Sequence, residues 1–154
     1  MLCCDRPGPR TGHAHGLLDT AAVTLLARLA DARQCSPERP LISTITLAEL
    51  SVGPLVAASA EERAARQAHV QQAEADFDPL PFDVASARAF GRVAASLQRA
   101  GRKAQARAYD AMIAAIALAN DLAVSTCNPG DFGDIDGLEV VPVPHPDEER
   151  HEAP

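Results

Sequence analysis

Short runs of apolar and β-branched residues alternate along the chain with longer stretches in which apolar residues recur at helical spacing. The runs predicted to be strands lie at residues 16–18, 40–45, 122–126 and 138–143, and a fifth run at 79–82 is predicted to be an edge strand. The helical stretches lie at residues 21–32, 46–52, 59–76, 83–100 and 109–120. This alternation is typical of an α/β domain with a mostly parallel sheet.

Local end signals support several of these helices. Thr46-Leu47-Ala48-Glu49 fits a capping box that begins a helix, and Gly53-Pro54 stops it. A second capping box spans Ser59 to Glu62, Asp83 is predicted to cap the next helix, and Gly101 ends it. After Asp110 every residue up to Ala119 is apolar, so this last helix is predicted to be covered on nearly all sides at the centre of the domain.

The two ends of the chain lack periodicity. Residues 1–14 carry Pro, Gly and charge, and we predict a flexible N-terminal tail, which a start codon assigned too far upstream would explain. Residues 144–154 are predicted to be a flexible acidic C-terminal tail. The folded domain is therefore expected to span residues 15–143.

Composition narrows the class of protein. The chain has 154 residues, 21 acidic against 14 basic, a net charge of −7, four phenylalanines, one tyrosine and no tryptophan. So few aromatic rings argue against a platform on which successive nucleic-acid bases stack. The longest apolar stretch, residues 111–119, is too short to cross a bilayer. Four cysteines, Cys3, Cys4, Cys35 and Cys127, form no CxxC pair, which suits a reducing cytoplasm and argues against a disulfide framework.

Four acidic residues fall where ligands bind in parallel α/β sheets, at the carboxyl ends of strands and the N-termini of the following helices. They are Asp19, Glu49, Asp110 and Asp131. Because like charges repel, a counter-charge is expected, and oxygen ligands without histidine or thiolate suit Mg²⁺ or Mn²⁺. Such a metal activates water for phosphodiester hydrolysis without a protein nucleophile.

Each acid also has a local structural explanation, and the pattern alone leaves both readings open. Glu49 fits the capping box, Asp110 is a favourable anion in the first turn of a helix, Asp19 is placed to cap the first helix, and Asp131 fits an Asn-Pro-Gly-Asp turn. A further hypothesis, ranked well below, makes Asp19 the nucleophile of an unrelated phosphotransfer domain.

A basic segment leads directly to Asp110. Residues 92–109 contain five arginines and lysines and no acidic residue. Its later members, Arg102, Lys103 and Arg107, are candidates for contacts to the backbone of an RNA substrate. The structural alternative is a solvated helix face with a basic last turn.

Four segments resemble, in order, the successive motifs of PIN-domain ribonucleases, specifically the VapC toxins of bacterial toxin–antitoxin pairs. They are Gly16-Leu17-Leu18-Asp19-Thr20, Ile45-Thr46-Leu47-Ala48-Glu49-Leu50 with Gly53, Tyr109-Asp110-Ala111-Met112-Ile113-Ala114-Ala115, and Val124-Ser125-Thr126-Cys127-Asn128-Pro129-Gly130-Asp131-Phe132. The resemblance spans about residues 15–143 and implies a three-layer α/β/α PIN-like domain with about four to five strands.

The resemblance also implies a site and an activity. Asp19, Glu49, Asp110 and Asp131 would bind Mg²⁺, with Mn²⁺ as a substitute, and Thr126 and Asn128 would support the site from a strand end. The expected reaction is endonucleolytic cleavage of structured RNA, usually tRNA or ribosomal RNA. The expected partners are a second copy in a homodimer, a cognate VapB antitoxin that blocks the site, and promoter DNA reached only through that antitoxin. The alternative function is a catalytically weak PIN domain that acts mainly by binding the antitoxin.

Overall fold

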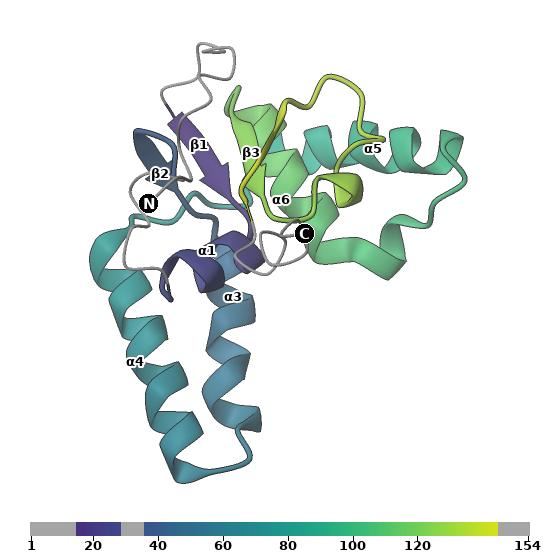
Figure 1. Cartoon of the computed structure of the whole chain (residues 1–154). Coiled ribbons are helices and arrows are strands. Elements are labelled where there is room, and N and C mark those ends of the chain that lie inside the picture. The colour runs from purple at the N-terminus through teal and green to yellow at the C-terminus, as the bar shows by residue number, and fades with distance from the viewer. Residues whose placement is uncertain (1–14, 29–35, 145–154) are drawn as a thin grey trace, which may run out of the picture.

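The computed structural model describes residues 15–28 and 36–144, and its centre is a four-stranded parallel sheet (Figure 1). The strands are β1 (His15–Leu18), β2 (Arg39–Leu41), β3 (Ala123–Thr126) and β4 (Val140–Pro142), in the order β2-β1-β3-β4. Every neighbouring pair is parallel, so all four carboxyl ends lie at one edge of the sheet. The predicted α/β class with a parallel sheet is confirmed.

Helices connect the strands and cover the sheet. The α-helices are α1 (Thr20–Leu26), α3 (Thr44–Val52), α4 (Ala60–Asp76), α5 (Val84–Arg99) and α6 (Ala108–Ala119), and the short 3₁₀ turns are η1 (Gly53–Val56), η2 (Ala104–Arg107) and η3 (Pro129–Asp131). Helices α3 and α4 lie side by side and project from the body as an arm, while α5 and α6 pack together on the other side of β1 (Figure 1). Within the described part of the chain, no helix is both long and apolar enough to span a membrane.

Two apolar clusters, one on each face of the sheet, form the core. Adjacent residues of β1 point to opposite faces, as the pleat of a strand requires. Leu17 packs in the cluster built on α5 and α6, and Leu18 packs in the cluster that contains Ala22 and Val23 of α1. Both faces of the central strand are therefore buried, which gives the three layers expected from the resemblance.

Helix α6 is as buried as its sequence predicts. Ala111 and residues 113–117 are all buried, and α5 is its most extensive neighbour. This burial fixes the N-terminal end of α6, and with it Asp110, relative to the sheet.

The prediction of a strand at residues 40–45 is wrong in its second half, where the structure begins α3. The side chain of Ser43 caps this helix, because its hydroxyl accepts a hydrogen bond of 3.2 Å from the backbone N–H of Thr46. Helix capping at Ser43 thus overrides the β propensity of the Ile-Thr sequence that follows. Glu49 consequently lies in the second turn of α3, so its predicted role in a capping box, with Thr46 as the cap, is also wrong.

Other boundaries differ by less. The first helix ends at Leu26, short of the predicted end near residue 32, and residues 29–35, with Cys35, lie outside the described residues. The predicted edge strand at 79–82 is reduced to one parallel bridge between Leu80 and Ser43. The tails predicted at 1–14 and 144–154 also lie outside the described residues, except for Pro144, and so do Cys3 and Cys4.

Gly16 allows the central strands to approach closely. A Cβ atom at this position would lie 2.8 Å from Pro37 Cγ and 2.9 Å from Ser125 Oγ, inside van der Waals contact. Gly16→Ala is therefore expected to lower the free energy of unfolding by about 1–3 kcal/mol, measured by urea denaturation. Gly91→Ala in α5 is the matched control, because a Cβ there meets nothing within 4 Å, and it should stabilise slightly. Equal stability of the Gly16 variant and the wild type would contradict this close packing.

Candidate active site

Asp19 is held at the carboxyl end of β1 by hydrogen bonds to both of its side-chain oxygens. Oδ1 accepts from the backbone N–H of Ala22 at 2.8 Å, so Asp19 does cap α1, as the local explanation proposed. Oδ2 accepts from the hydroxyl of Thr126 at 2.6 Å. The residue is only 4% exposed, and both oxygens are occupied, which disfavours the hypothesis that it acts as a nucleophile.

Thr126 joins the ends of β1 and β3. Its fully buried hydroxyl donates to Asp19 and accepts a 3.0 Å hydrogen bond from the backbone N–H of Asn128. The fixed hydroxyl orients one carboxylate oxygen of Asp19. Asn128 contributes to this network through its backbone N–H, and the residue is exposed to solvent.

Glu49 reaches the same edge from α3. The hydroxyl of Thr20 donates a 2.7 Å hydrogen bond to Glu49 Oε1. The hydroxyl oxygen of Thr20 also lies 3.1 Å from that of the fully buried Thr46. Thr20 follows Asp19 directly in the chain. The end of β1 therefore positions two carboxylates: Asp19 provides one, and Thr20 holds the other, that of Glu49 on α3.

Asp110 enters from a third element, the first turn of α6. Burial raises the pKa of Asp110, whereas the positive charge of Arg107 lowers that pKa. Burial also raises the pKa of Asp19 and of Glu49, and in both cases the negative charge of Asp110 raises the pKa further. The negative charge of Asp19 also raises the pKa of Glu49. The three carboxylates thus form one electrostatically coupled group at the edge predicted from the sequence.

This coupling predicts how stability depends on pH. The folded-state pKa values of Asp19, Glu49 and Asp110 lie above their unfolded values, so the folded state binds these protons more tightly. As the pH rises from about 4 through these raised pKa values, the metal-free wild type should therefore lose stability relative to Asp110→Asn. Urea denaturation of both proteins in EDTA across this range measures the difference. A difference that stays constant with pH would contradict the coupling.

Asp131 lies in η3, and its carboxylate is paired with Arg107. The guanidinium of Arg107 forms an ion pair with the carboxylate of Asp131. Because Arg107 also lowers the pKa of Asp110, this one guanidinium acts on both the fourth acid and the coupled group. The sequence predicted four carboxylates at one edge of the sheet. In the structure, three of them form the coupled group, and the charge of the fourth, Asp131, is neutralised by Arg107.

The other basic candidates differ in their surroundings. Arg102 donates a 3.0 Å hydrogen bond to the carbonyl of Gly130 and lies 2.8 Å from the carboxylate of Asp134. It therefore ties the end of α5 to the loop after β3. Lys103 is exposed at the start of η2.

The acidic group fits a hard divalent cation by its chemistry. Asp19, Glu49 and Asp110 offer only carboxylate oxygens, and repulsion among three partly buried carboxylates is relieved when a cation binds. Within the described residues, no three His, Cys, Asp or Glu side chains are grouped at the spacing of metal ligands. The three carboxylates therefore lie at one edge of the sheet at separations wider than those of metal ligands.

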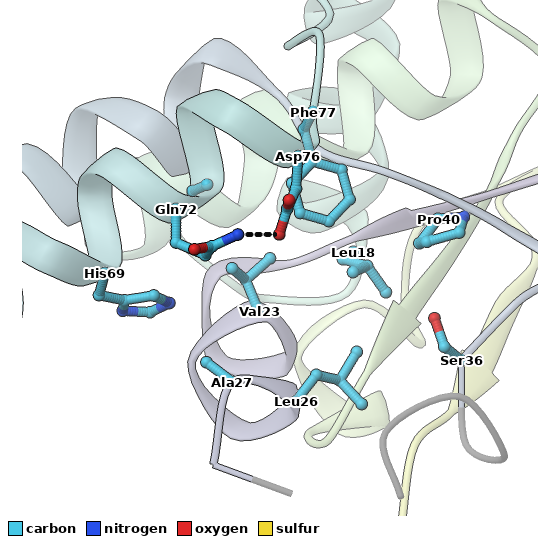
Figure 2. A pocket seen from close by; sticks show the side chains of 11 residues that line it. Leu18, Val23, Leu26, Ala27, Ser36, Pro40, His69, Gln72, Asp76 and Phe77 are labelled. Atoms are coloured by element: carbon cyan, nitrogen blue, oxygen red, sulfur yellow. Dashed lines mark hydrogen bonds between the residues drawn. The ribbon is translucent and has the colours of Figure 1, made fainter. Parts of the chain in front are cut away.

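Two hollows differ sharply in chemistry. The pocket in Figure 2, of 320 Å³, lies among β1, α1 and α4, and Leu18, Val23, Leu26 and Phe77 give it a mainly apolar wall. A second hollow, of 620 Å³, is lined by residues that include Glu49 and Asp110. A third hollow, of 750 Å³, reaches Glu49 from the side of Thr20. Of the three, the second hollow is the one lined by both Glu49 and Asp110.

Sequence reasoning missed the two threonines that support Glu49. Thr20 was assigned no role, and Thr46 was predicted only as a helix cap. In the structure Thr20 donates to Glu49, and Thr46 contacts the hydroxyl of Thr20. The available signal was the position of Thr20, which directly follows Asp19 at the end of a strand. The role of Arg107 as partner of Asp131 was missed because it depends on a contact across 24 residues of sequence.

Comparison with known proteins places this arrangement in a family. Residues 17–138 match the family model described as the PIN domain. The chain is 37% identical over 135 residues to ribonuclease VapC5 of Mycobacterium tuberculosis, which covers 86% of this chain and 96% of that protein. The chain belongs to the PIN-domain family, among the VapC ribonucleases. The resemblance found in the sequence is thereby confirmed.

Solved structures agree with this membership. The VapC-family chain superposes on a crystal structure of a VapBC family member, VapBC-5 of Mycobacterium tuberculosis, with a TM-score of 0.71 and 38% identity, covering 84% of this chain and 99% of that one. It also superposes on DNA-bound VapBC from Salmonella typhimurium, with a TM-score of 0.71 and 27% identity, covering 83% and 97% of the two chains. The predicted PIN fold is therefore confirmed.

Proposed function

We propose that this VapC-family protein is a Mg²⁺-dependent endoribonuclease toxin that hydrolyses phosphodiester bonds in structured RNA, either tRNA or ribosomal RNA. The observation that carries the proposal is the coupled group of Asp19, Glu49 and Asp110, which three separate elements bring to the carboxyl end of a parallel sheet. Membership of a ribonuclease family supports the reaction type.

The roles of the residues follow from their contacts. Asp19, Glu49 and Asp110 would hold the cation, with Asp131 as a further acid once it leaves Arg107. When bound, the cation supplies a water of lowered pKa and neutralises charge on the scissile phosphate. Thr126 orients Asp19, with Asn128 behind it, and Thr20 orients Glu49, so hydrogen bonds fix the direction of both carboxylates.

The proposed partners rest on the relatives. Of the two similar structures described above, one is a member of the VapBC family and the other is a VapBC bound to DNA. We propose that this chain forms a homodimer, is neutralised by a VapB-type antitoxin, and reaches promoter DNA only through that antitoxin. The net charge of −7 is consistent with DNA contacts made by the partner.

The test of the proposed function is cleavage of total cellular RNA by the purified, antitoxin-free protein in Mg²⁺, in Mn²⁺ and in EDTA. We expect discrete fragments that require a divalent ion, and their sequencing identifies the RNA and the bond cleaved. A folded protein that cleaves nothing in either ion would contradict the proposal and favour the alternative, a PIN domain that acts mainly by binding an antitoxin.

The basic segment gives a separate prediction about RNA binding. Lys103→Glu is expected to weaken binding and to make the dependence of affinity on salt shallower by about one unit of slope, because one phosphate contact is lost. Arg102→Glu should weaken binding too, but it also breaks the contacts of Arg102 with Gly130 and Asp134. Arg63→Glu on α4 is the control with the same charge change. Unaltered affinity of the Lys103 variant at low salt would remove that residue from the RNA interface.

A further inference from the structure

One aromatic ring of the chain remains at the surface, and it lies beside the carboxylates. Phe132 is buried, Phe82 and Phe90 pack edge to face at 6.4 Å, and Phe77 is half-buried in the wall of the apolar pocket. Tyr109 is 57% exposed. Because all four phenylalanines and the one tyrosine fall within the described ranges, this comparison covers every Phe, Tyr and Trp ring in the protein.

Helix geometry separates Tyr109 from the acid that follows it. Consecutive residues of an α-helix point about 100° apart, so the half-buried Asp110 faces the coupled group while Tyr109 faces outward. Both side chains line the same 620 Å³ hollow, together with Glu49 and Arg107. That volume lies within the range of about 300–1,000 Å³ found for small-molecule sites.

The hollow combines what one nucleotide needs. Carboxylates that hold a cation on one side would fix the scissile phosphate, Arg107 brings positive charge, and the exposed ring of Tyr109 offers an aromatic face to a base. Burial of an exposed tyrosine ring against a base also removes apolar surface from water. A single ring stacks a single base, which agrees with a composition too poor in aromatic residues for a multi-base platform.

We propose that Tyr109 is a substrate-binding residue whose ring stacks on an unpaired base adjacent to the scissile phosphate. The substrate class follows from this role: the base must be out of a helix, so the cleaved bond lies in a loop, bulge or single-stranded end of the RNA. The inference rests on the proposed ribonuclease function and adds the position of one base.

The experiment separates stacking from charge and from catalysis. Binding is measured by fluorescence anisotropy in EDTA, in an Asp110→Asn background, with an adenosine RNA of about 12 nucleotides and an abasic ribose-phosphate chain of the same length and charge. We expect Tyr109→Ala to weaken binding of the adenosine RNA by about 10-fold and to leave the abasic chain unchanged. Tyr109→Phe keeps the ring and should bind both as the parent does.

Two results would overturn the proposal. A loss of equal size on both chains would mean that Tyr109 acts through structure or charge, and no loss on either would mean that it does not touch RNA. Sedimentation of the same variants detects the competing explanation, in which Tyr109 is covered by a second copy: a dimer lost in Tyr109→Ala with unchanged RNA binding assigns the ring to that interface. Failure of catalysis is distinguished by the cleavage of total RNA, which uses the unaltered protein.

Discussion

Replacement of Asp110 by Asn is expected to lower metal-dependent RNA cleavage by more than about 100-fold. Removing a residue that only hydrogen-bonds to a metal ligand typically lowers metal affinity or activity by about 10- to 100-fold. Because Asp110 is proposed to be a ligand itself, its loss should cost more. The same change should leave the free energy of unfolding of the metal-free protein equal or higher, because burial raises the pKa of Asp110 and the folded state holds its charge unfavourably. Cleavage of labelled RNA and urea denaturation in EDTA measure the two effects.

A matched control tests whether the effect belongs to the site. Asp78→Asn removes an exposed carboxylate between α4 and α5, and it should change neither cleavage nor stability. Asp19→Asn should resemble Asp110→Asn in activity. Thermal unfolding adds a direct readout of the metal, since Mg²⁺ should raise the melting temperature of the wild type and much less that of the two site variants. Full cleavage by both site variants would defeat the assignment of these carboxylates.

Replacement of Phe132 by Ala is expected to have the largest effect on stability. The ring is 1% exposed in the cluster that α5 and α6 build against the sheet, and its removal should lower the free energy of unfolding by about 3–5 kcal/mol. Domains of this kind are stable by about 5–15 kcal/mol, so the loss is a large part of the total. Phe132 also anchors η3, and therefore the loop that carries Asp131, to the core.

Leu55→Ala is the comparison for this prediction. Leu55 is 82% exposed at the tip of the arm formed by α3 and α4, so its truncation should change stability by less than about 0.5 kcal/mol. Both variants are measured by urea denaturation under identical conditions. A loss below about 1 kcal/mol for Phe132→Ala would show that the loop after β3 is not held by the core.

The sequence predicted the parts of the fold that follow from strong local patterns. The unbroken apolar run after Asp110 identified the central helix, and Asp83 with Gly101 marked both ends of α5. The start of α3 was misplaced because Ile45 and Thr46 have high β propensity, while the deciding hydrogen bond is made by a single serine, Ser43. The β propensity of residues 45 and 46 can be read from the sequence, whereas the hydrogen bond of the Ser43 side chain that outweighs it is seen only in the structure.

The sequence was sufficient to predict that three of the candidate acids lie at one edge of the sheet, but not which side chains hydrogen-bond or pair with them. Asp19, Glu49 and Asp110 meet because parallel strands end at one edge, a rule that needs only the order of elements. The pairing of Arg107 with Asp131 and of Thr20 with Glu49 depends on side-chain directions across distant segments. No spacing in the sequence encodes those directions.

The parallel pairing of β1 with β3 has a consequence for synthesis. The hydrogen bond between Thr126 and Asp19 joins residues 107 positions apart. Strand β1 can pair with β2 early in synthesis, but it meets its other neighbour, β3, only after all the intervening helices have been made. Contacts of such long range form late, since the chain between them must first be translated and collapsed. A chain that ends between α6 and β3 therefore contains both helices of the arm and Asp19, Glu49 and Asp110, but it lacks Thr126, the residue that orients Asp19.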